Sequence, residues 1–128
     1  MKKLLTVGLI SMGLVSTSVF AGSTKTWVYE TSKHNIKITC RNVESYEDSD
    51  VVCSSEDCTY QSWNKPKQIG QGKPDLEIRK GSKDHSAHLG STFDFTKGNK
   101  TISILNDEKM EISVNGRTQQ KYRLKRKN

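Results

Sequence analysis

Apolar positions recur at every second residue along most of the chain, which is the period of a β-strand with one buried face. Ile36, Ile38 and Cys40, for example, alternate with polar residues. Similar alternation marks further short segments, at 27–30, 58–62 and 76–79. No stretch of helical period and convincing length is present, so these segments predict strands.

The last third of the chain shows this pattern most clearly. Four alternating segments are separated by turn residues, and the last turn, Asn115-Gly116, tolerates the positive φ angles of a tight hairpin turn. The predicted inner positions are Phe93, Phe95, Ile102, Ile104, Met110, Ile112, Val114, Tyr122 and Leu124. Residues 92–124 therefore predict a four-stranded antiparallel meander with one buried face.

We accordingly predict an all-β fold, a small antiparallel β-barrel or sandwich of about seven to eight short strands. Closing the sheet would remove exposed edges. Residues 64–75 are rich in Gly, Pro and Lys and predict a long loop, and residues 81–91 predict another. The end of the chain, from Lys125 on, is expected to be frayed.

The N-terminus has the features of a secretory signal peptide. Lys2 and Lys3 precede an apolar run, which ends before the small-residue sequence Val19-Phe20-Ala21-Gly22. We predict a cleaved signal peptide over residues 1–21 and a single β domain over 22–128, periplasmic or secreted. The run is shorter than the roughly 20 residues that cross a bilayer, so no transmembrane segment is expected.

Export favours a disulfide among the three cysteines. Cys53 and Cys58 flank a short segment that looks like a hairpin loop, and we favour a Cys53–Cys58 bond. Cys40 would point inward as a free, buried thiol. Pairing of Cys40 with either of the others stays open, because connectivity cannot be read from spacing.

The formal net charge is +7, and the basic excess lies in residues 61–128. An exported basic protein is attracted to anionic lipid headgroups or lipopolysaccharide, and export makes nucleic acid a poor partner. On a strand, Lys121, Arg123 and Lys125 would form a basic stripe on the outer face, or protect an edge strand.

Candidate chemistry is sparse. His85 and His88 lie near a carboxylate in a polar segment, but two histidines fall short of a closed metal site, so no metal is expected. Acidic residues between Glu44 and Asp57 lack the spacing of a calcium loop. No nucleophile signature is present, so we expect neither an enzyme nor a cofactor. Trp63, at a strand end, is a candidate contact residue.

Several short segments resemble the periplasmic C-type lysozyme inhibitors (the MliC/PliC family). They are Val28-Tyr29-Glu30, Ile36-Lys37-Ile38-Thr39, Leu76-Glu77-Ile78-Arg79-Lys80-Gly81, Ser86-Ala87 and Phe93-Asp94-Phe95-Thr96-Lys97-Gly98. The resemblance implies a β-barrel whose loop serine and lysine enter the lysozyme cleft, and by position these are Ser86 and Lys97. The family's cysteine after the first tyrosine is replaced here by Thr31.

The predicted function is therefore non-enzymatic binding of a protein partner, as an inhibitor of a cell-wall hydrolase or as an immunity protein against a toxin. The predicted contact residues are Ser86, Lys97, His85, His88 and Trp63. One alternative is a basic envelope adaptor that binds anionic lipid or lipopolysaccharide. A further alternative is a periplasmic metal-binding protein that uses His85 and His88.

Overall fold

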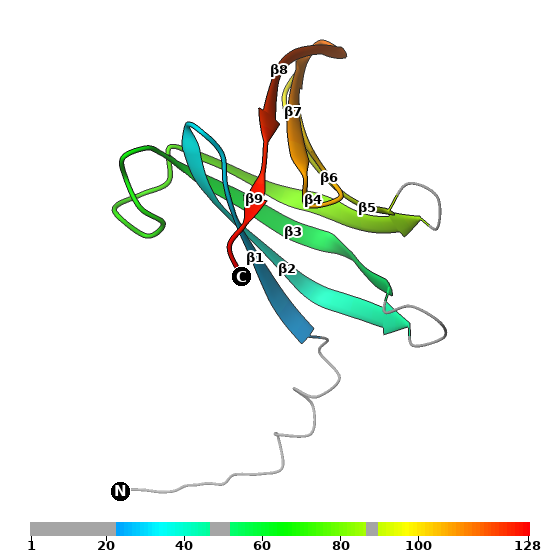
Figure 1. Cartoon of the computed structure of the whole chain (residues 1–128). Coiled ribbons are helices and arrows are strands. Elements are labelled where there is room, and N and C mark those ends of the chain that lie inside the picture. Colours follow the sequence, from blue (N-terminus) through cyan, green and yellow to red (C-terminus); the bar gives the residue numbers. More distant parts are fainter. Residues whose placement is uncertain (1–22, 47–51, 87–89) are drawn as a thin grey trace, which may run out of the picture.

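The computed structural model describes residues 23–46, 52–86 and 90–128, and these residues form one β-sheet (Figure 1). This part of the chain contains no helix that is long and apolar enough to cross a membrane. The nine strands are β1 (Ser23–Glu30), β2 (His34–Tyr46), β3 (Val52–Asn64), β4 (Leu76–Ser86), β5 (Gly90–Lys97), β6 (Lys100–Leu105), β7 (Lys109–Val114), β8 (Arg117–Arg123) and β9 (Lys125–Arg126).

The sheet is an antiparallel, nearly closed barrel. Its strand order is β8-β7-β6-β5-β4-β3-β2-β1-β9, so each strand up to β8 pairs with the next one in sequence. The final segment bends at Leu124: β8 pairs with β7, whereas β9 pairs with β1 and brings the two ends of the sheet together. The predicted all-β barrel is confirmed, with nine strands in the described residues where seven to eight were expected.

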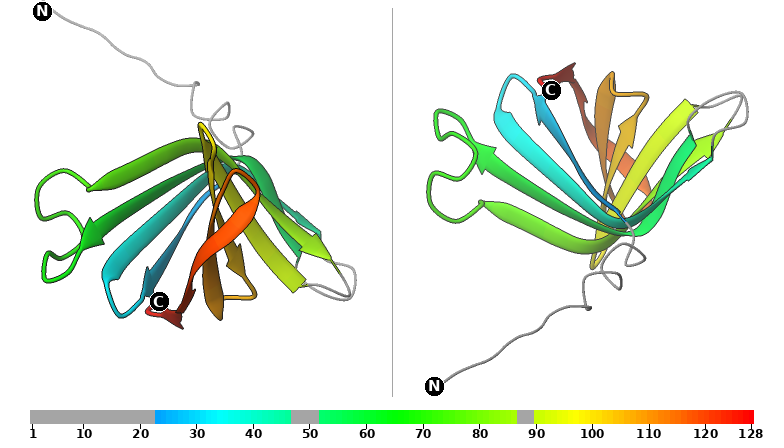
Figure 2. Two further views of the ribbon diagram at one scale, coloured as in Figure 1. Left: turned by 90° about the horizontal axis from the view of Figure 1, so that it is seen from above. Right: turned by 90° about the horizontal axis from the view of Figure 1, so that it is seen from below.

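Bulges in the long strands β2, β3 and β4 bend the sheet. The β1–β2 register shifts between residues 23 and 25, beside Asn42, which has a φ of 54°. The β3–β4 register shifts twice between Ser55 and Tyr60, opposite Lys80, which has a φ of 61°. Bulges increase bend and twist, and Figure 2 shows the sheet curving round on itself. Gly81 follows the bulge and leaves room for the Phe95 ring, whose Cδ1 would lie 2.2 Å from a Cβ there.

The barrel interior is filled by side chains. Phe93 is central, because its ring lies 5.1 Å from that of Trp27 and 6.2 Å from that of Phe95. The predicted inner positions of the meander are confirmed except Val114 and Tyr122, which are half-buried. The core comprises Trp27, Tyr29, Ile36, Ile38, Cys40, Val43, Cys58, Tyr60, Ile78, Phe93, Phe95, Ile102, Ile104, Met110, Ile112 and Leu124.

The disulfide joins Cys40 to Cys58, so the favoured Cys53–Cys58 bond is wrong. Cys40 on β2 and Cys58 on β3 are directly opposite in the register, with Cα atoms 4.0 Å apart, and both are fully buried. Cys53 lies on the same strand as Cys58, and five residues of strand span about 16 Å. A disulfide needs Cα atoms within about 7 Å. Cys40 points inward as predicted, but it is bonded rather than free.

Two predicted irregular segments are strands. Within residues 81–91, residues up to Ser86 belong to β4, and Gly90 and Ser91 begin β5. The chain end is ordered rather than frayed, since β9 pairs with β1 and Asn128 donates to the Thr26 carbonyl at 2.9 Å. The long loop predicted at 64–75 is confirmed, because β3 ends at Asn64 and β4 begins at Leu76.

Candidate functional site

The β4–β5 hairpin carries two of the predicted contact residues, His85 and Ser86, at one end of the barrel. His85 is exposed and lies opposite Ser91, and Ser86 ends β4 opposite Gly90. His88 lies outside the described residues. The hairpin thus brings His85 and Ser86 to its tip, as consecutive residues of one strand.

Lys97 lies at the opposite end of β5 from this tip. It is exposed and pairs with Lys100 at the β5–β6 turn, whereas Ser86 pairs with the first residue of β5. Seven residues of strand separate the two positions, which corresponds to about 23 Å. The structure therefore places Ser86 at the tip of the β4–β5 hairpin and Lys97 at the β5–β6 turn, at opposite ends of β5.

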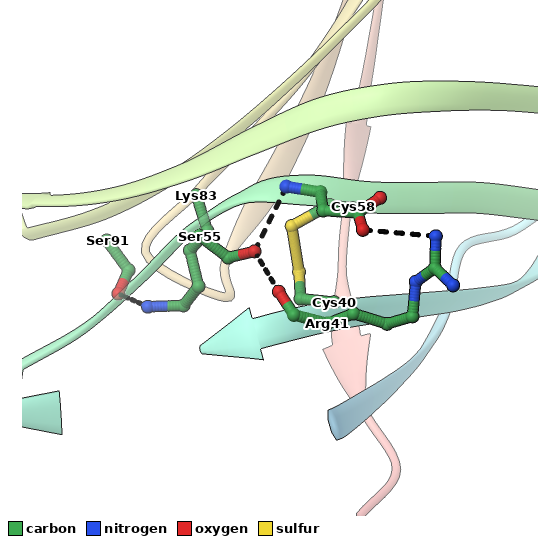
Figure 3. The surroundings of a disulfide bond; sticks show 7 residues. Cys40, Arg41, Ser55, Cys58, Lys83 and Ser91 are labelled. Carbon is green, nitrogen blue, oxygen red and sulfur yellow. Dashed lines mark hydrogen bonds and ion pairs between the residues drawn. A yellow bond between two sulfur atoms is a disulfide. The ribbon is translucent and has the colours of Figure 1, made fainter. Parts of the chain in front are cut away.

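A surface hollow of about 400 Å³ lies beside the tip end of the hairpin, and Trp27, Lys83 and His85 are among its lining residues. Lys83 is 5% exposed, points inward from β4, and donates from Nζ to Ser91 Oγ at 3.3 Å. Figure 3 shows this contact. The Lys83 Nζ also lies 5.6 Å from the centre of the Trp27 ring, so a cation–π contact helps to hold the charge in this buried position.

Asp107 in the β6–β7 turn forms the other side of this hollow. Its carboxylate accepts a hydrogen bond from the Tyr29 hydroxyl at 2.5 Å and one from Arg126 at 3.2 Å. Burial, and then the hydrogen bond to Asp107, raise the pKa of Tyr29 far above its usual value. The phenol therefore stays protonated and acts as a donor that ties β1 to the turn.

The polar groups around the disulfide are satisfied by one another (Figure 3). Ser55 is buried, donates to the Arg41 carbonyl at 2.6 Å and accepts from the Asp57 amide at 3.1 Å. The Arg41 guanidinium pairs with the Asp57 carboxylate at 3.1 Å on the outer face. These bonds replace strand-to-strand hydrogen bonds that the backbone loses at the bulge, so the role of this cluster is structural. Residues 47–51 of the predicted acidic stretch lie outside the described residues.

Trp63 stabilises the 64–75 loop rather than offering a contact surface. It is 3% exposed, and its Nε1 donates to the Gly72 carbonyl at 3.1 Å. Asp75 closes the loop by pairing with Lys67 at 2.7 Å and accepting from the Asn64 amide. The hydrogen bonds from Lys67 and from that amide lower the pKa of Asp75. The sequence placed Trp63 at a strand end correctly, but burial removes it from the predicted contact set.

The bend at Leu124 divides the predicted basic stripe, because Lys121 and Arg123 lie on β8 whereas Lys125 lies on β9. Arg126 pairs with Asp107 at 3.2 Å, and Lys127 pairs with Glu30 at 3.2 Å. Lys121 and Arg123 lie exposed on β8. Within the described ranges no three His, Cys, Asp or Glu residues are grouped as a metal site.

Comparison with known proteins gives no relative. No family model matches the chain, and neither a curated protein nor a solved structure was found to be similar to it. The resemblance to lysozyme inhibitors therefore stays a prediction, and function is argued below from the geometry alone.

Proposed function

We propose that this protein is exported and acts by binding another protein through its outer surface, as an inhibitor of a cell-wall hydrolase or as an immunity protein. The observation that supports this proposal most is a filled barrel with the β4–β5 hairpin at one end. Phe93, Phe95 and Ile102 are essentially fully buried in the interior. A barrel of this size whose interior is packed with side chains leaves its surface and loops for binding.

The hairpin suits this role because the strand ends next to its tip are fixed. Lys83 and Ser91 join its two strands by side chains, and Asn106 accepts a hydrogen bond from the Ser91 amide at 3.0 Å. Gly90 allows this close approach, since a Cβ there would lie 1.7 Å from the Asn106 Oδ1. A recognition element held in place before binding loses less conformational entropy when it docks.

The proposed contact set is therefore divided in two. His85 and Ser86 belong to the hairpin tip. His88 stays in the proposed set and lies outside the described residues. Lys97 belongs to the β5–β6 turn, about 23 Å away along β5. A hydrolase cleft that accepts the hairpin would meet His85 and Ser86, and Lys97 would matter only to a partner that reaches along the whole strand.

The test is an activity titration against c-, g- and i-type lysozymes with single variants. Ser86→Ala and His85→Gln should weaken a stoichiometric inhibition, because both lie at the tip. Lys97→Ala tests the second position, and Lys73→Ala in the exposed 64–75 loop is the matched control. If a large molar excess inhibits none of the three types, the lysozyme version is refuted, and a bacteriolytic toxin from a competitor becomes the next partner to assay.

The basic envelope adaptor remains a second proposal, because Lys121 and Arg123 are exposed on β8. Binding through exposed charges should weaken steeply as ionic strength rises, whereas an inserted hairpin should be far less sensitive. A salt series of the binding constant therefore separates the two functions. Equilibrium dialysis with Zn²⁺ tests the remaining alternative, metal binding by His85 and His88.

A further inference from the structure

Like charges face each other on the outer side of the β7–β8 hairpin. Lys109 on β7 lies directly opposite Arg123 on β8, so two cations face each other. The next outward pair, Glu111 and Lys121, has opposite charges. All four point outward, because the intervening Met110 is fully buried in the core. Two cations directly opposite on neighbouring strands repel each other and destabilise the pairing.

These cations line a surface hollow of about 500 Å³ at the place where the last strand bends. Its walls include Lys109, Lys121 and Arg123, together with Tyr122 of β8 and Leu124 between β8 and β9. The hollow lies on the β7–β8 hairpin, whose strands rise away from β1–β4 in Figure 1. It is a site separate from the β4–β5 tip, because none of its lining residues belongs to β4 or β5.

The carboxylates nearby balance only part of this charge. Glu111 lies 3.5 Å from the Lys109 Nζ, and Asp107 is engaged by Tyr29 and Arg126. Glu108 adds one exposed carboxylate at the rim. No ion pair within 4.0 Å involves Lys121 or Arg123 in the described part of the chain. The hollow therefore has a positive excess.

We propose that this hollow binds a phosphate group between Lys109 and Arg123, with Lys121 contributing from the side. The guanidinium of Arg123 offers paired donors that match phosphate oxygens, and the two ammonium groups supply compact positive charge. A bound phosphate would convert the Lys109–Arg123 repulsion into two attractions. The group could belong to free phosphate, a phosphorylated sugar or a lipid headgroup, and the site does not depend on the proposed inhibitor function.

The experiment measures heat of binding and the melting temperature with three probes at constant ionic strength. The probes are inorganic phosphate, glucose 6-phosphate, and phosphatidylcholine vesicles with or without phosphatidylglycerol. Arg123→Gln and Lys109→Gln are each expected to weaken binding about tenfold, equivalent to about 1.4 kcal/mol. Lys73→Gln, an exposed lysine in the 64–75 loop, should bind as the wild type does. The probe that binds tightest identifies the source of the phosphate.

The variants also separate a binding site from a structural role. Without phosphate, Arg123→Gln should melt slightly above the wild type, because the repulsion is gone. With saturating phosphate the wild type should melt above Arg123→Gln. An arginine with only a structural role would not give this reversal of the two melting temperatures. The proposal is overturned if no probe binds, or if Lys73→Gln loses as much affinity as the variants at Lys109 and Arg123.

Discussion

Closure of the barrel should depend on the partly buried hydrogen bond between Tyr29 and Asp107, and Tyr29→Phe removes only the hydroxyl. The ring is fully buried, and the oxygens are 2.5 Å apart. A hydrogen bond from a buried donor to a charged acceptor contributes about 1.5–3 kcal/mol. We expect Tyr29→Phe to lower the free energy of unfolding by about 2 kcal/mol, because the packing of the ring is unchanged.

A double-mutant cycle isolates this bond. Asp107 has a φ of 59°, which asparagine tolerates and alanine does not, so Asp107→Asn is the gentler partner variant. It keeps a neutral acceptor for Tyr29, but it removes the charge from that hydrogen bond and from the contact with the half-exposed Arg126, which is worth about 0.5 kcal/mol. In an Asp107→Ala background the phenol has no acceptor, so adding Tyr29→Phe should cost almost nothing.

Urea unfolding at neutral pH, followed by tryptophan fluorescence, measures each free energy by linear extrapolation. The expected coupling between Tyr29→Phe and Asp107→Ala is about 2 kcal/mol. The hydrogen bond does not hold the barrel closed if the free energy of unfolding of Tyr29→Phe lies within about 0.5 kcal/mol of the wild-type value. The same conclusion follows if Tyr29→Phe lowers the free energy of unfolding equally in the wild type and in the Asp107→Ala background.

Three further predictions concern other parts of the barrel. Gly90→Ala places a Cβ 1.7 Å from the Asn106 Oδ1, whereas at Gly98 nothing lies within 4 Å and only the left-handed φ costs about 1 kcal/mol. In thermal melting, Gly90→Ala should therefore lower the melting temperature at least twice as much as Gly98→Ala does. Replacing Cys40 and Cys58 by alanine should cost about 3 kcal/mol, and dithiothreitol should no longer shift the urea midpoint. Burial lowers the pKa of His34 below 6.5, so as the pH falls the unfolded chain binds the proton before the folded chain does. The free energy of unfolding should therefore decrease as the pH is lowered below about 6.5. His34→Gln should make this decrease less steep, and an unchanged pH dependence would exclude this histidine as its source.

The sequence predicts strands well where one face is buried and apolar. Ile36 and Ile38, or Phe93 and Phe95, follow the two-residue period because each second side chain enters the core. Residues 81–91 predict a loop, although they include the end of β4 and the start of β5, because the inward positions Gly81 and Lys83 do not continue an apolar alternation. Lys83 is buried with its ammonium over the Trp27 and Phe93 rings and bonded to Ser91, and a pattern of alternating apolar residues does not indicate such an environment.

Pairing between distant segments is the part that local patterns could not supply. Cys40 and Cys58 each sit in an alternating segment that points inward, but their contact depends on the β2–β3 register. Likewise, Lys125 and Arg126 have no apolar pattern, and they form β9 only because β1 offers a free edge. Among the candidate site residues, Trp63 was misjudged for the same reason, since the loop that covers it is fixed by tertiary contacts.

Closure of this barrel relies on side chains as much as on backbone pairing. β9 meets β1 through two register pairs, a short seam for a sheet of this length. The β6–β7 turn reinforces it from inside: Asp107 holds Tyr29 of β1 and Arg126 of β9, while the adjacent Asn106 holds Ser91 of β5. One turn thus connects the barrel seam to the tip end of the β4–β5 hairpin. Loosening the seam at Asp107 should therefore also loosen the proposed binding element, although the two lie on strands far apart in the sheet.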